Sequence, residues 1–357
     1  MSILNFVTAL ILICTVWMVA VKFGIKKLTC ARSFSRSTVF EGDEGELVEV
    51  VRNDGPFVIP WLRVESYISP HLRLGRQENL DVKGESFYSS CYTLMSYQQI
   101  RRRHRVKYLR RGIYDLGNAT LSSGDLLGLT RFWKEQKLHT EVTVYPRILE
   151  QQEFAYPVSR ILGELLVRHQ LLKDPFFVRG VRDYQPGDLI RDIHWAATAR
   201  TGDVQVRVHD HTARTRLLVV LNVQHSDAQW DNYIKESDEA VVEEEIRLAA
   251  SLCIHALRGG VAAGFAANMP QGKAETCTVL LPAEGAAWEE ELLTAFARLD
   301  MRCADKFLKL LDDLNAYEGL DILVISRYDS QAIQSAIAKL RSSGNQVNFY
   351  QMEGGSL

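Results

Sequence analysis

The sequence predicts three folded parts: an N-terminal transmembrane helix, an all-β, sandwich-like domain and an α/β domain with a mostly parallel sheet. An apolar run at residues 3–23 predicts the helix. Short alternating segments separated by turns at residues 37–147 are typical of a β-sandwich. Between residues 217 and 357, apolar strand patterns alternate with helical patterns, which predicts parallel strands with helices on both faces. We expect boundaries at 1–25 for a transmembrane anchor, 37–147 for the β-domain, 148–216 for a connector and 217–357 for the α/β domain.

The apolar run is long enough to cross a bilayer, because a helix over residues 3–23 rises about 31 Å. A cleaved signal peptide is the alternative, but positions 1–6 contain no Lys or Arg, which such a peptide needs before its apolar core. Basic residues follow the run, and the positive-inside rule then leaves the rest of the chain in the cytoplasm. They are Lys22, Lys26, Lys27, Arg32 and Arg36. We therefore expect a single-pass protein of a bacterial cell membrane with its large part in the cytoplasm.

The overall composition is that of a globular protein with a normal core, and no cofactor is expected. Of 357 residues, 46% are hydrophobic and 24% charged, and the net charge of −2 argues against a general nucleic-acid binder. The cysteines include no Cys-x-x-Cys pair, so neither a zinc site nor a redox motif is predicted.

Within the predicted β-domain, Leu62, Val64 and Ile68 alternate with polar residues, and residues 53–56 form a turn before them. Further strands are expected near residues 46–52, 86–94, 102–108 and 140–145. The most basic stretch of the chain lies here, at Arg101, Arg102, Arg103 and Arg105, followed by Lys107, Arg110 and Arg111. It either contacts anionic lipid headgroups, at about 1 kcal/mol per charge, or forms a solvated edge strand that discourages pairing. No aromatic platform accompanies the charge, so nucleic acid is disfavoured.

The second half reads as an ordered series of strands and helices. Strands are expected at residues 217–222, 261–267, 276–281, 321–326 and 346–351, and helices at 238–257, 286–299 and 331–341. A helix at 159–172 is expected within the connector.

The connector also contains the most distinctive segment of the chain, at residues 180–200. Pro186 and Gly187 suit the central positions of a type II turn, and Asp188 can cap a following helix. Ile190 and Ile193 then lie on one helical stripe. The segment resembles the hallmark of the family called "domain of unknown function 58". The matching positions are Gly180, Arg182, Tyr184, Pro186, Gly187, Asp188, Arg191, Ile193, Trp195, Ala199 and Arg200.

The resemblance extends over roughly residues 36 to 230 through the segments at 111–114, 124–129 and 144–147. It implies that a von Willebrand factor A-like domain follows the hallmark. The hallmark itself has two readings, which can coexist. We favour a structural ion-pair network with Trp195 as a wedge between domains; the other reading is a docking surface, because Arg and Trp are enriched in binding hot spots.

An A-type domain usually binds a divalent cation through Asp-x-Ser-x-Ser after its first strand, because hard oxygen ligands suit Mg²⁺. This chain has Asn222, Gln224 and Ser226 at those positions, and its fourth strand ends in Ser326 and Arg327. We therefore expect a degenerate site without metal. His209 and His211 would share one face of a strand and could begin a metal site with His194 or Asp210, but exposed, unliganded histidines are the favoured reading.

No catalytic motif with supporting context is found in the sequence. The function expected is a membrane-anchored, non-catalytic adaptor whose cytoplasmic A-like domain binds proteins. The resemblance implies its partners, a AAA+ ATPase of MoxR type and other A-domain proteins, in envelope assembly or maintenance. The alternatives are a hydrolase or transferase with an unrecognised interdomain site, and a metal-dependent adhesion module. Contacts are expected at the carboxyl edge of the sheet, at Asn222, Gln224, Ser226 and Ser326, with steering of a basic partner by Asp238, Glu239, Glu243 and Glu244.

Overall fold

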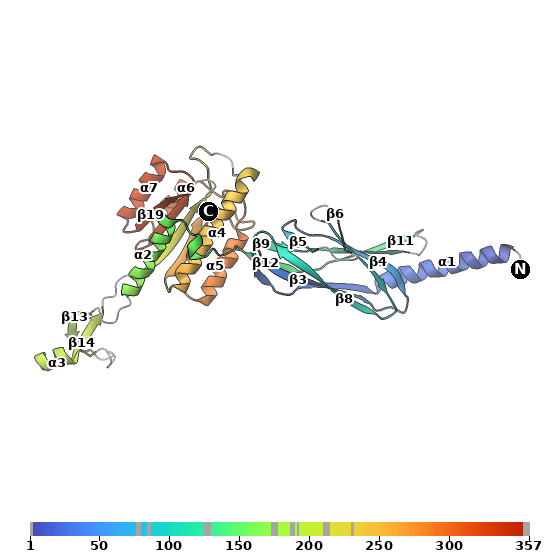
Figure 1. Cartoon of the computed structure of the whole chain (residues 1–357), viewed down its shortest axis with the longest axis horizontal. Helices are drawn as coiled ribbons and strands as arrows, with labels where there is room; N and C mark the ends of the chain where they lie inside the picture. Colours follow the sequence, from blue (N-terminus) through green and yellow to red (C-terminus); the bar gives the residue numbers. More distant parts are fainter. Residues whose placement is uncertain are drawn as a thin grey trace. The chain divides into compact units, whose positions relative to one another are not determined.

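The computed structural model describes residues 3–75, 80–83, 87–124, 130–172, 178–185, 190, 193–209, 215–229 and 232–352. The chain divides into two compact units, Met1–Arg147 and Ile148–Leu357. In Figure 1 the first unit is coloured blue to cyan and the second green to red.

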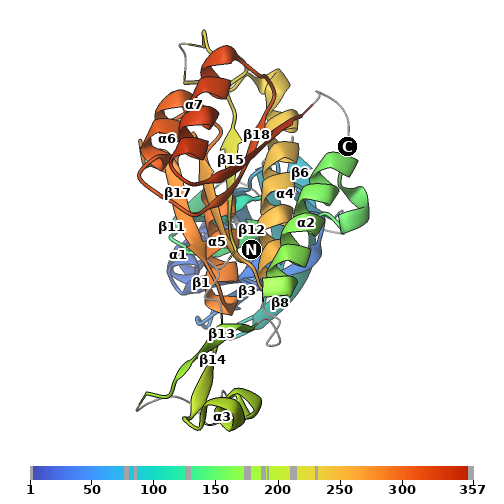
Figure 2. The same cartoon turned by 90° about the vertical axis from the view of Figure 1, so that its left-hand side faces the viewer.

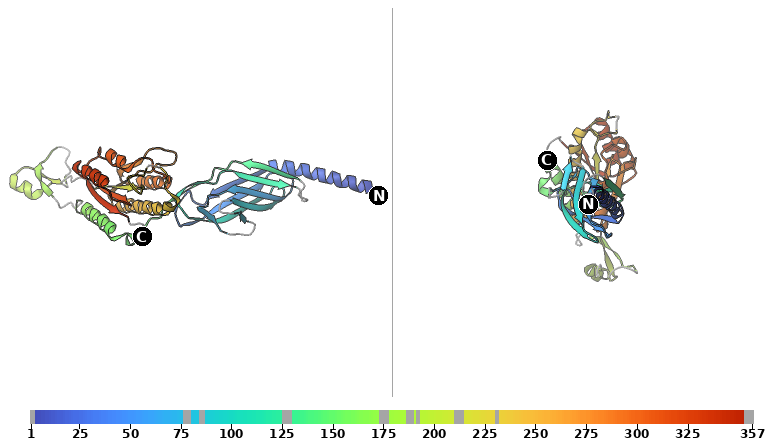
Figure 3. Two further views of the ribbon diagram at one scale, coloured as in Figure 1. Left: turned by 90° about the horizontal axis from the view of Figure 1, so that it is seen from above. Right: turned by 90° about the vertical axis from the view of Figure 1, so that its right-hand side faces the viewer.

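The first unit is a sandwich of two antiparallel sheets, which confirms the predicted β-rich region. One sheet has the order β1-β3-β8-β5 and the other β11-β10-β4-β7-β6. The first consists of β1 (Leu28–Phe34), β3 (Glu44–Asn53), β8 (Gln99–Tyr108) and β5 (Leu72–Leu74). The second consists of β11 (Arg131–Gln136), β10 (Ala119–Gly124), β4 (Ile59–Tyr67), β7 (Phe87–Leu94) and β6 (Leu80–Lys83). The strands run lengthwise along the unit, as Figure 3 shows.

Apolar side chains from both sheets form the core between them. Leu28 and Val51 from one sheet pack with Leu62, Leu94 and Leu121 from the other. A third sheet, of β2 (Thr38–Phe40), β12 (Glu141–Tyr145) and β9 (Gly112–Asp115), packs on the same sandwich through a second apolar cluster. The alternation of buried and exposed residues, evident in β4 and β8, is what the sequence pattern predicted.

A buried ion pair lies between these apolar clusters. The Arg32 Nε donates to Glu49 Oε1 at 2.7 Å, and both side chains are 0% exposed. Its guanidinium also donates to Ser66 Oγ at 2.7 Å. The second Glu49 oxygen accepts from the hydroxyls of Tyr88, at 3.2 Å, and Tyr92. A buried charge is tolerated only when it is paired and hydrogen-bonded, and this network meets both conditions.

His104 extends this network and makes the stability of the unit depend on pH. Its Nε2 lies 3.0 Å from the Tyr88 hydroxyl. Burial lowers the pKa of His104 below its usual value; the Glu49 carboxylate opposes this shift, whereas Arg102 and Arg32 act in the same direction as burial. In the folded state His104 therefore stays neutral at a pH at which the same histidine is protonated in the unfolded chain, near 6.5.

We expect the free energy of unfolding to fall as the pH drops through about 6.5, by at most about 1.4 kcal/mol per pH unit for this group. Urea unfolding between pH 7.5 and 5.5 measures this. His104→Gln should flatten the dependence, and equal slopes in both proteins would contradict it.

The apolar N-terminal run forms helix α1 (Ile3–Lys26). Its last turn packs against the sandwich, where Ile25 is 5% exposed and shares a core with Leu28 at the start of β1. Among the residues that the structure describes, no helix is both long enough and apolar enough to cross a membrane. The transmembrane anchor expected at residues 1–25 is thus not found, and the end of this segment is used in packing on the β-domain.

The second unit is built on a five-stranded sheet with the order β17-β16-β15-β18-β19. Its strands are β15 (Arg216–Asn222), β16 (Ala262–Ala267), β17 (Thr278–Ala283), β18 (Asp321–Ser326) and β19 (Gln346–Gln351). All neighbouring pairs are parallel except β16 and β17, which confirms the predicted mostly parallel sheet.

Helices cover both faces of this sheet (Figure 2). One face packs against α2 (Tyr156–Leu172), α4 (Glu236–Arg258) and α5 (Ala286–Arg298), and the other against α6 (Phe307–Leu314) and α7 (Gln331–Ser342). The sequence pattern predicted all of these except α6. The connector helix α2 belongs to this layer, because Leu162 and Leu165 share a core with Val219 of β15.

The distinctive segment forms a hairpin of β13 (Val178–Asp183) and β14 (Gln205–His209), with α3 (Trp195–Thr201) between them. The helix predicted to follow Asp188 is wrong at Ile193, which instead forms an antiparallel bridge with Val206. Ile193 is buried, and this β-branched residue gains more from packing beside β14 than from helix formation. His194 caps α3, where its Nδ1 accepts from Ala197 N at 3.1 Å. Pro186, Gly187, Asp188 and Arg191 lie outside the described residues.

Candidate functional site at the carboxyl edge of the α/β sheet

The candidate site lies where the winding of the sheet changes direction. From β15 the chain proceeds to β16 and β17 on one side, and then returns to β18 and β19 on the other. Open α/β sheets bind ligands in the crevice beyond the carboxyl ends of the two strands that flank this switch. Here those strands are β15 and β18, and their last residues, Asn222 and Ser326, are partners in the register.

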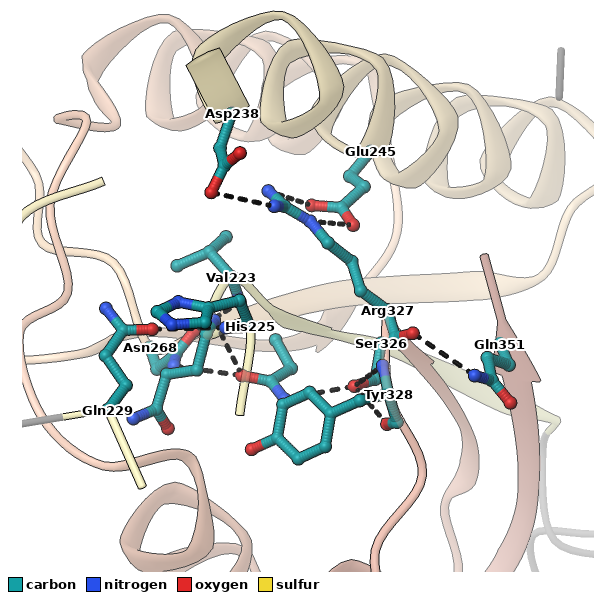
Figure 4. Close-up of polar contacts among 12 residues, drawn as sticks. Val223, His225, Gln229, Asp238, Glu245, Asn268, Ser326, Arg327, Tyr328 and Gln351 are labelled. Atoms are coloured by element: carbon teal, nitrogen blue, oxygen red, sulfur yellow. Dashed lines mark hydrogen bonds and ion pairs between the residues drawn. The ribbon is translucent and has the colours of Figure 1, made fainter. Parts of the chain in front are cut away.

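The floor of the site is a closed network of neutral side chains (Figure 4). Asn222 Nδ2 donates to Ser326 Oγ at 3.0 Å, and Asn222 Oδ1 accepts from Gln224 N at 3.1 Å and from Asn268 Nδ2 at 3.2 Å. Asn268 Oδ1 accepts in turn from Val223 N at 3.0 Å. Asn222, Asn268 and Ser326 are all 0% exposed, so the network is part of the core.

Gln224 connects the loop after β15 to helix α6, which covers one face of the sheet. Its Oε1 accepts from Phe307 N at the start of α6, at 2.8 Å. The side-chain oxygens of Asn222 and Gln224, two of the three positions at which the sequence analysis expected a degenerate cation site, therefore both accept hydrogen bonds from N–H groups. In the part of the chain that the structure describes, no group of three or more His, Cys, Asp or Glu residues is placed to hold a metal ion.

A charged layer covers the network. The Arg327 Nε donates to Glu245 Oε1 at 2.9 Å, and its guanidinium lies 3.8 Å from Asp238 Oδ2 (Figure 4). Gln351 Nε2 donates to the Arg327 carbonyl at 3.2 Å, which connects β19 to the same layer. Burial raises the pKa of Glu245 to about 7, because the attraction of Arg327 offsets only part of its desolvation.

The sequence analysis noted Arg327 only because it stands where an aspartate would have helped to bind a cation, and it did not single out Glu245. The spacing of Asp238 and Glu245 was the available signal, because residues seven apart lie on the same face of a helix. Since the Glu245 carboxylate is fully buried behind Arg327, this pair suits a fixed structural contact better than proton exchange with a substrate.

Several residues expected to contact partners are buried. Asn222, Gln224 and Ser326 are 0%, 5% and 0% exposed, and Glu243, expected to steer a partner, is also buried. The side chains of Asn222, Gln224 and Ser326 turn inward to the network, so they are not exposed for contact with a partner. The exposed rim of the site comprises His225, Asp227, Glu236 and Asp329, with Ser226, Asp238 and Glu239 partly exposed. Asp227 is held at the rim by the Tyr328 hydroxyl, which donates to its Oδ1 at 3.0 Å.

Part of this unit matches a known protein family. Residues 180–297 match the family model described as "Protein of unknown function DUF58". This stretch runs from β13 to α5 and contains the floor residues Asn222 and Asn268. The chain is also similar to the uncharacterized protein YeaD of Bacillus subtilis (strain 168), with 22% identity over 251 residues. That alignment covers 68% of this chain and 56% of the relative, so the chain spans little more than half of the relative's length.

Solved structures resemble the chain only distantly. The CARDB domain of a Pyrococcus furiosus protein aligns with a TM-score of 0.23 and 13% identity, and covers 33% of this chain and 93% of that one. A non-cellulosomal cohesin from Archaeoglobus fulgidus aligns with a TM-score of 0.22 and 12% identity, over 35% of this chain and 94% of that one. No functional conclusion follows at this level of similarity.

The other residues singled out in the sequence do not join the site. Arg101, Arg102, Arg103 and Arg105 lie on β8 of the first unit. In the hairpin, Tyr184 and Trp195 are 43% and 65% exposed, and Arg200 is exposed as well. Arg182 donates to the Asp183 carbonyl at 3.0 Å. Gly180 lies within β13. The side chain of His209, and all of His211, fall outside the described residues.

We predict that the α/β domain does not respond to divalent cations. The melting temperature of the chain in millimolar Mg²⁺ or Mn²⁺ should equal that in chelator, because the Asn222 and Gln224 oxygens already accept hydrogen bonds. Asn222→Asp tests the network itself, since it removes the donor to Ser326 and should cost about 1–3 kcal/mol in chelator. A rise of several degrees for the unaltered chain with either metal would contradict the prediction.

The exposure of Trp195 predicts that it contributes to binding more than to folding. Trp195→Ala should change the free energy of unfolding by less than about 0.5 kcal/mol, as is usual for exposed positions. Denaturant titration followed by circular dichroism measures this. A loss above about 2 kcal/mol would instead support the structural wedge expected from the sequence.

Proposed function

We propose that the chain is a non-catalytic, protein-binding module whose α/β domain engages its partner at the carboxyl edge of the sheet. The observation that carries the proposal is the neutral, hydrogen-bonded floor at Asn222, Asn268 and Ser326. It occupies the position where open α/β sheets bind ligands, but its polar atoms are turned to one another. Such a floor leaves recognition to the rim above it.

The rim carries several acidic side chains. Asp227, Glu236 and Asp329 are exposed there, and Asp238 is partly exposed beside Arg327. These acidic side chains favour a basic partner surface and speed its approach at low salt. For the partner we propose a AAA+ ATPase of MoxR type, and beside it other A-domain proteins, in the assembly or maintenance of envelope complexes. This choice rests on the family resemblance of residues 180–200 together with the acidic rim.

The test is binding of the full chain to the MoxR-type ATPase encoded nearest to it, with ATP, ADP or no nucleotide. Asp227→Arg with Asp329→Arg should weaken binding about tenfold or more and reduce its salt dependence, because two rim charges are reversed. Glu318→Arg is the matched control, since Glu318 is also exposed but precedes β18 at the opposite edge of the sheet. Absence of binding in every nucleotide state, or equal losses in both variants, would refute the proposal.

Attachment to a membrane is a further part of the proposal and rests on the sequence alone. The apolar residues 3–23 and the basic residues after them are its support. A reporter that is active only in the cytoplasm, fused after Leu357, should be active in cells and remain with the membrane fraction. Activity of a reporter that works only outside the cytoplasm would refute the orientation.

A further inference from the structure

Two loops of the first unit lie at the end of the sandwich from which helix α1 extends (Figure 3). The loop at residues 54–58 connects β3 to β4, and the loop at residues 95–98 connects β7 to β8. Both loops therefore pass from one sheet of the sandwich to the other. The Asp54 N–H donates to the Lys27 carbonyl at 3.1 Å, which places the end of α1 beside the first loop.

The buried side chain of Asn53 holds both loops in place. Its Nδ2 donates to the Phe57 carbonyl at 2.8 Å and to the Met95 carbonyl at 2.9 Å, and its Oδ1 accepts from Gly55 N at 3.0 Å. The Gly55 carbonyl accepts in turn from Tyr97 N at 3.2 Å. Asn53 is 0% exposed. The conformation of the loop tips is therefore set from within the sandwich.

The side chains at the loop tips are large, apolar and exposed. Met95 and Tyr97 are 57% and 71% exposed, and Phe57 and Val58 are exposed as well. Tyr97 also has a φ of +56°, a left-handed conformation that is costly for a bulky residue and that glycine adopts freely. Strain of this kind is concentrated at functional sites. Because the fold gains little from an exposed ring, contact with something outside the chain explains a tyrosine here.

Helix α1 exposes apolar side chains on opposite sides. Val7 and Ile11 are exposed, and so are Leu12 and Val16. Since an α-helix turns by about 100° per residue, the second pair lies roughly opposite the first. A groove in a partner protein suits a helix with one apolar face, whereas apolar side chains on opposite sides suit hydrocarbon surroundings. The Thr15 hydroxyl needs no outside partner there, because it donates to the Leu12 carbonyl at 2.8 Å.

Positive charge accompanies the apolar tips. Three exposed lysines, Lys22, Lys26 and Lys27, lie on or just after the last turns of α1. Asp54 is the acid of the first loop, and it lies 2.5 Å from Arg52, which offsets its charge. Neither loop sequence contains another acid. Apolar side chains beside lysines match the boundary of an anionic bilayer, where the former reach the acyl chains and the latter attract phosphate groups.

We propose that this end of the β-sandwich lies on an anionic lipid bilayer, with the tips of both loops inserted at the level of the headgroups. The proposal rests on the membrane attachment proposed above and adds the surface through which the folded domain contacts lipid. Because the strands run lengthwise, the opposite end of the sandwich is held away from the bilayer. Gln99 and Lys107 measure this difference, since both are exposed on β8 and lie about 27 Å apart along it.

The test uses the full chain in vesicles of phosphatidylglycerol and phosphatidylcholine, and flotation of the vesicles measures attachment. A polarity-sensitive dye is placed on Gln99→Cys or, as the matched control, on Lys107→Cys, each with the exposed Cys91 changed by Cys91→Ser. The Cys91→Ser chain alone gives the background of the dye. Nitroxide groups on the lipid headgroups should quench the dye at position 99 strongly and the dye at position 107 little.

A second pair of variants tests the loop tips themselves. Met95→Ser with Tyr97→Gly should remove most of the quenching at position 99, while flotation persists through α1. Circular dichroism should show the fold retained, because both side chains are exposed and glycine accepts a positive φ. Tyr67→Ser is the control, since Tyr67 is 75% exposed at the far end of β4, and it should leave the quenching unchanged.

The outcomes separate this contact from the attachment on which it rests. A chain that floats but shows equal quenching at positions 99 and 107 would overturn the contact and leave the attachment standing. A blue shift of the dye at position 99 without quenching would also overturn it, because protein, such as a second copy of the chain, would then cover the tips. Failure of the chain to float would refute the attachment and the contact together.

Discussion

The α/β domain is organised by the requirement that strand β15 be buried on both of its faces. Leu217 and Val219 point into one apolar core, and Leu218 and Val220 into the other. A strand of this kind must lie inside a sheet with helices above and below it, because either face would otherwise expose a continuous apolar surface. Its neighbours β16 and β18 are parallel to it, so the three carboxyl ends meet at one edge. The position of Asn222 in the crevice follows from that arrangement.

At this edge, the buried polar groups are neutral and hydrogen-bonded to one another. An aspartate at position 222 would need a cation or another counter-charge to remain ionised in a fully buried location. Asparagine has the same shape, and its amide can donate to Ser326 while its oxygen accepts two N–H groups. The network is complete without an external ligand. Recognition can then be assigned to the exposed residues around it, where changes of side chain do not disturb the core.

The long periodic segments of the α/β domain could be predicted from the sequence because packing and local pattern agree there. Strand β15 and helix α4 are examples, since β15 is a short, continuous apolar run and the apolar residues of α4 have the helical period. Helix α6 was missed because eight residues contain little more than two turns of pattern. The helix expected at Ile193 was wrong because burial beside Val206 outweighed the local helical spacing.

The site could be predicted only in part, for a physical reason. The pattern of strands placed Asn222 and Ser326 at the same edge, since parallel strands end together. It could not show that Gln224 turns inward, because its partner Phe307 is far away in the sequence and belongs to a helix that was not expected. Arg327 and Glu245 are likewise joined only by the packing of α4 on the sheet.

The buried pair of Arg32 and Glu49 has a consequence for the alignment of β1. The two residues are direct partners across β1 and β3. If β1 slid by one residue, Arg32 would turn to the outer face, because the side-chain period of a strand is two. Glu49 would then be left in the core without a counter-charge, at a cost of roughly 3–5 kcal/mol. The alternation of buried and exposed residues in β1 disfavours the same slip, since it would also move Leu28 and Cys30 out of the core, and the ion pair adds its own penalty to the wrong alignment.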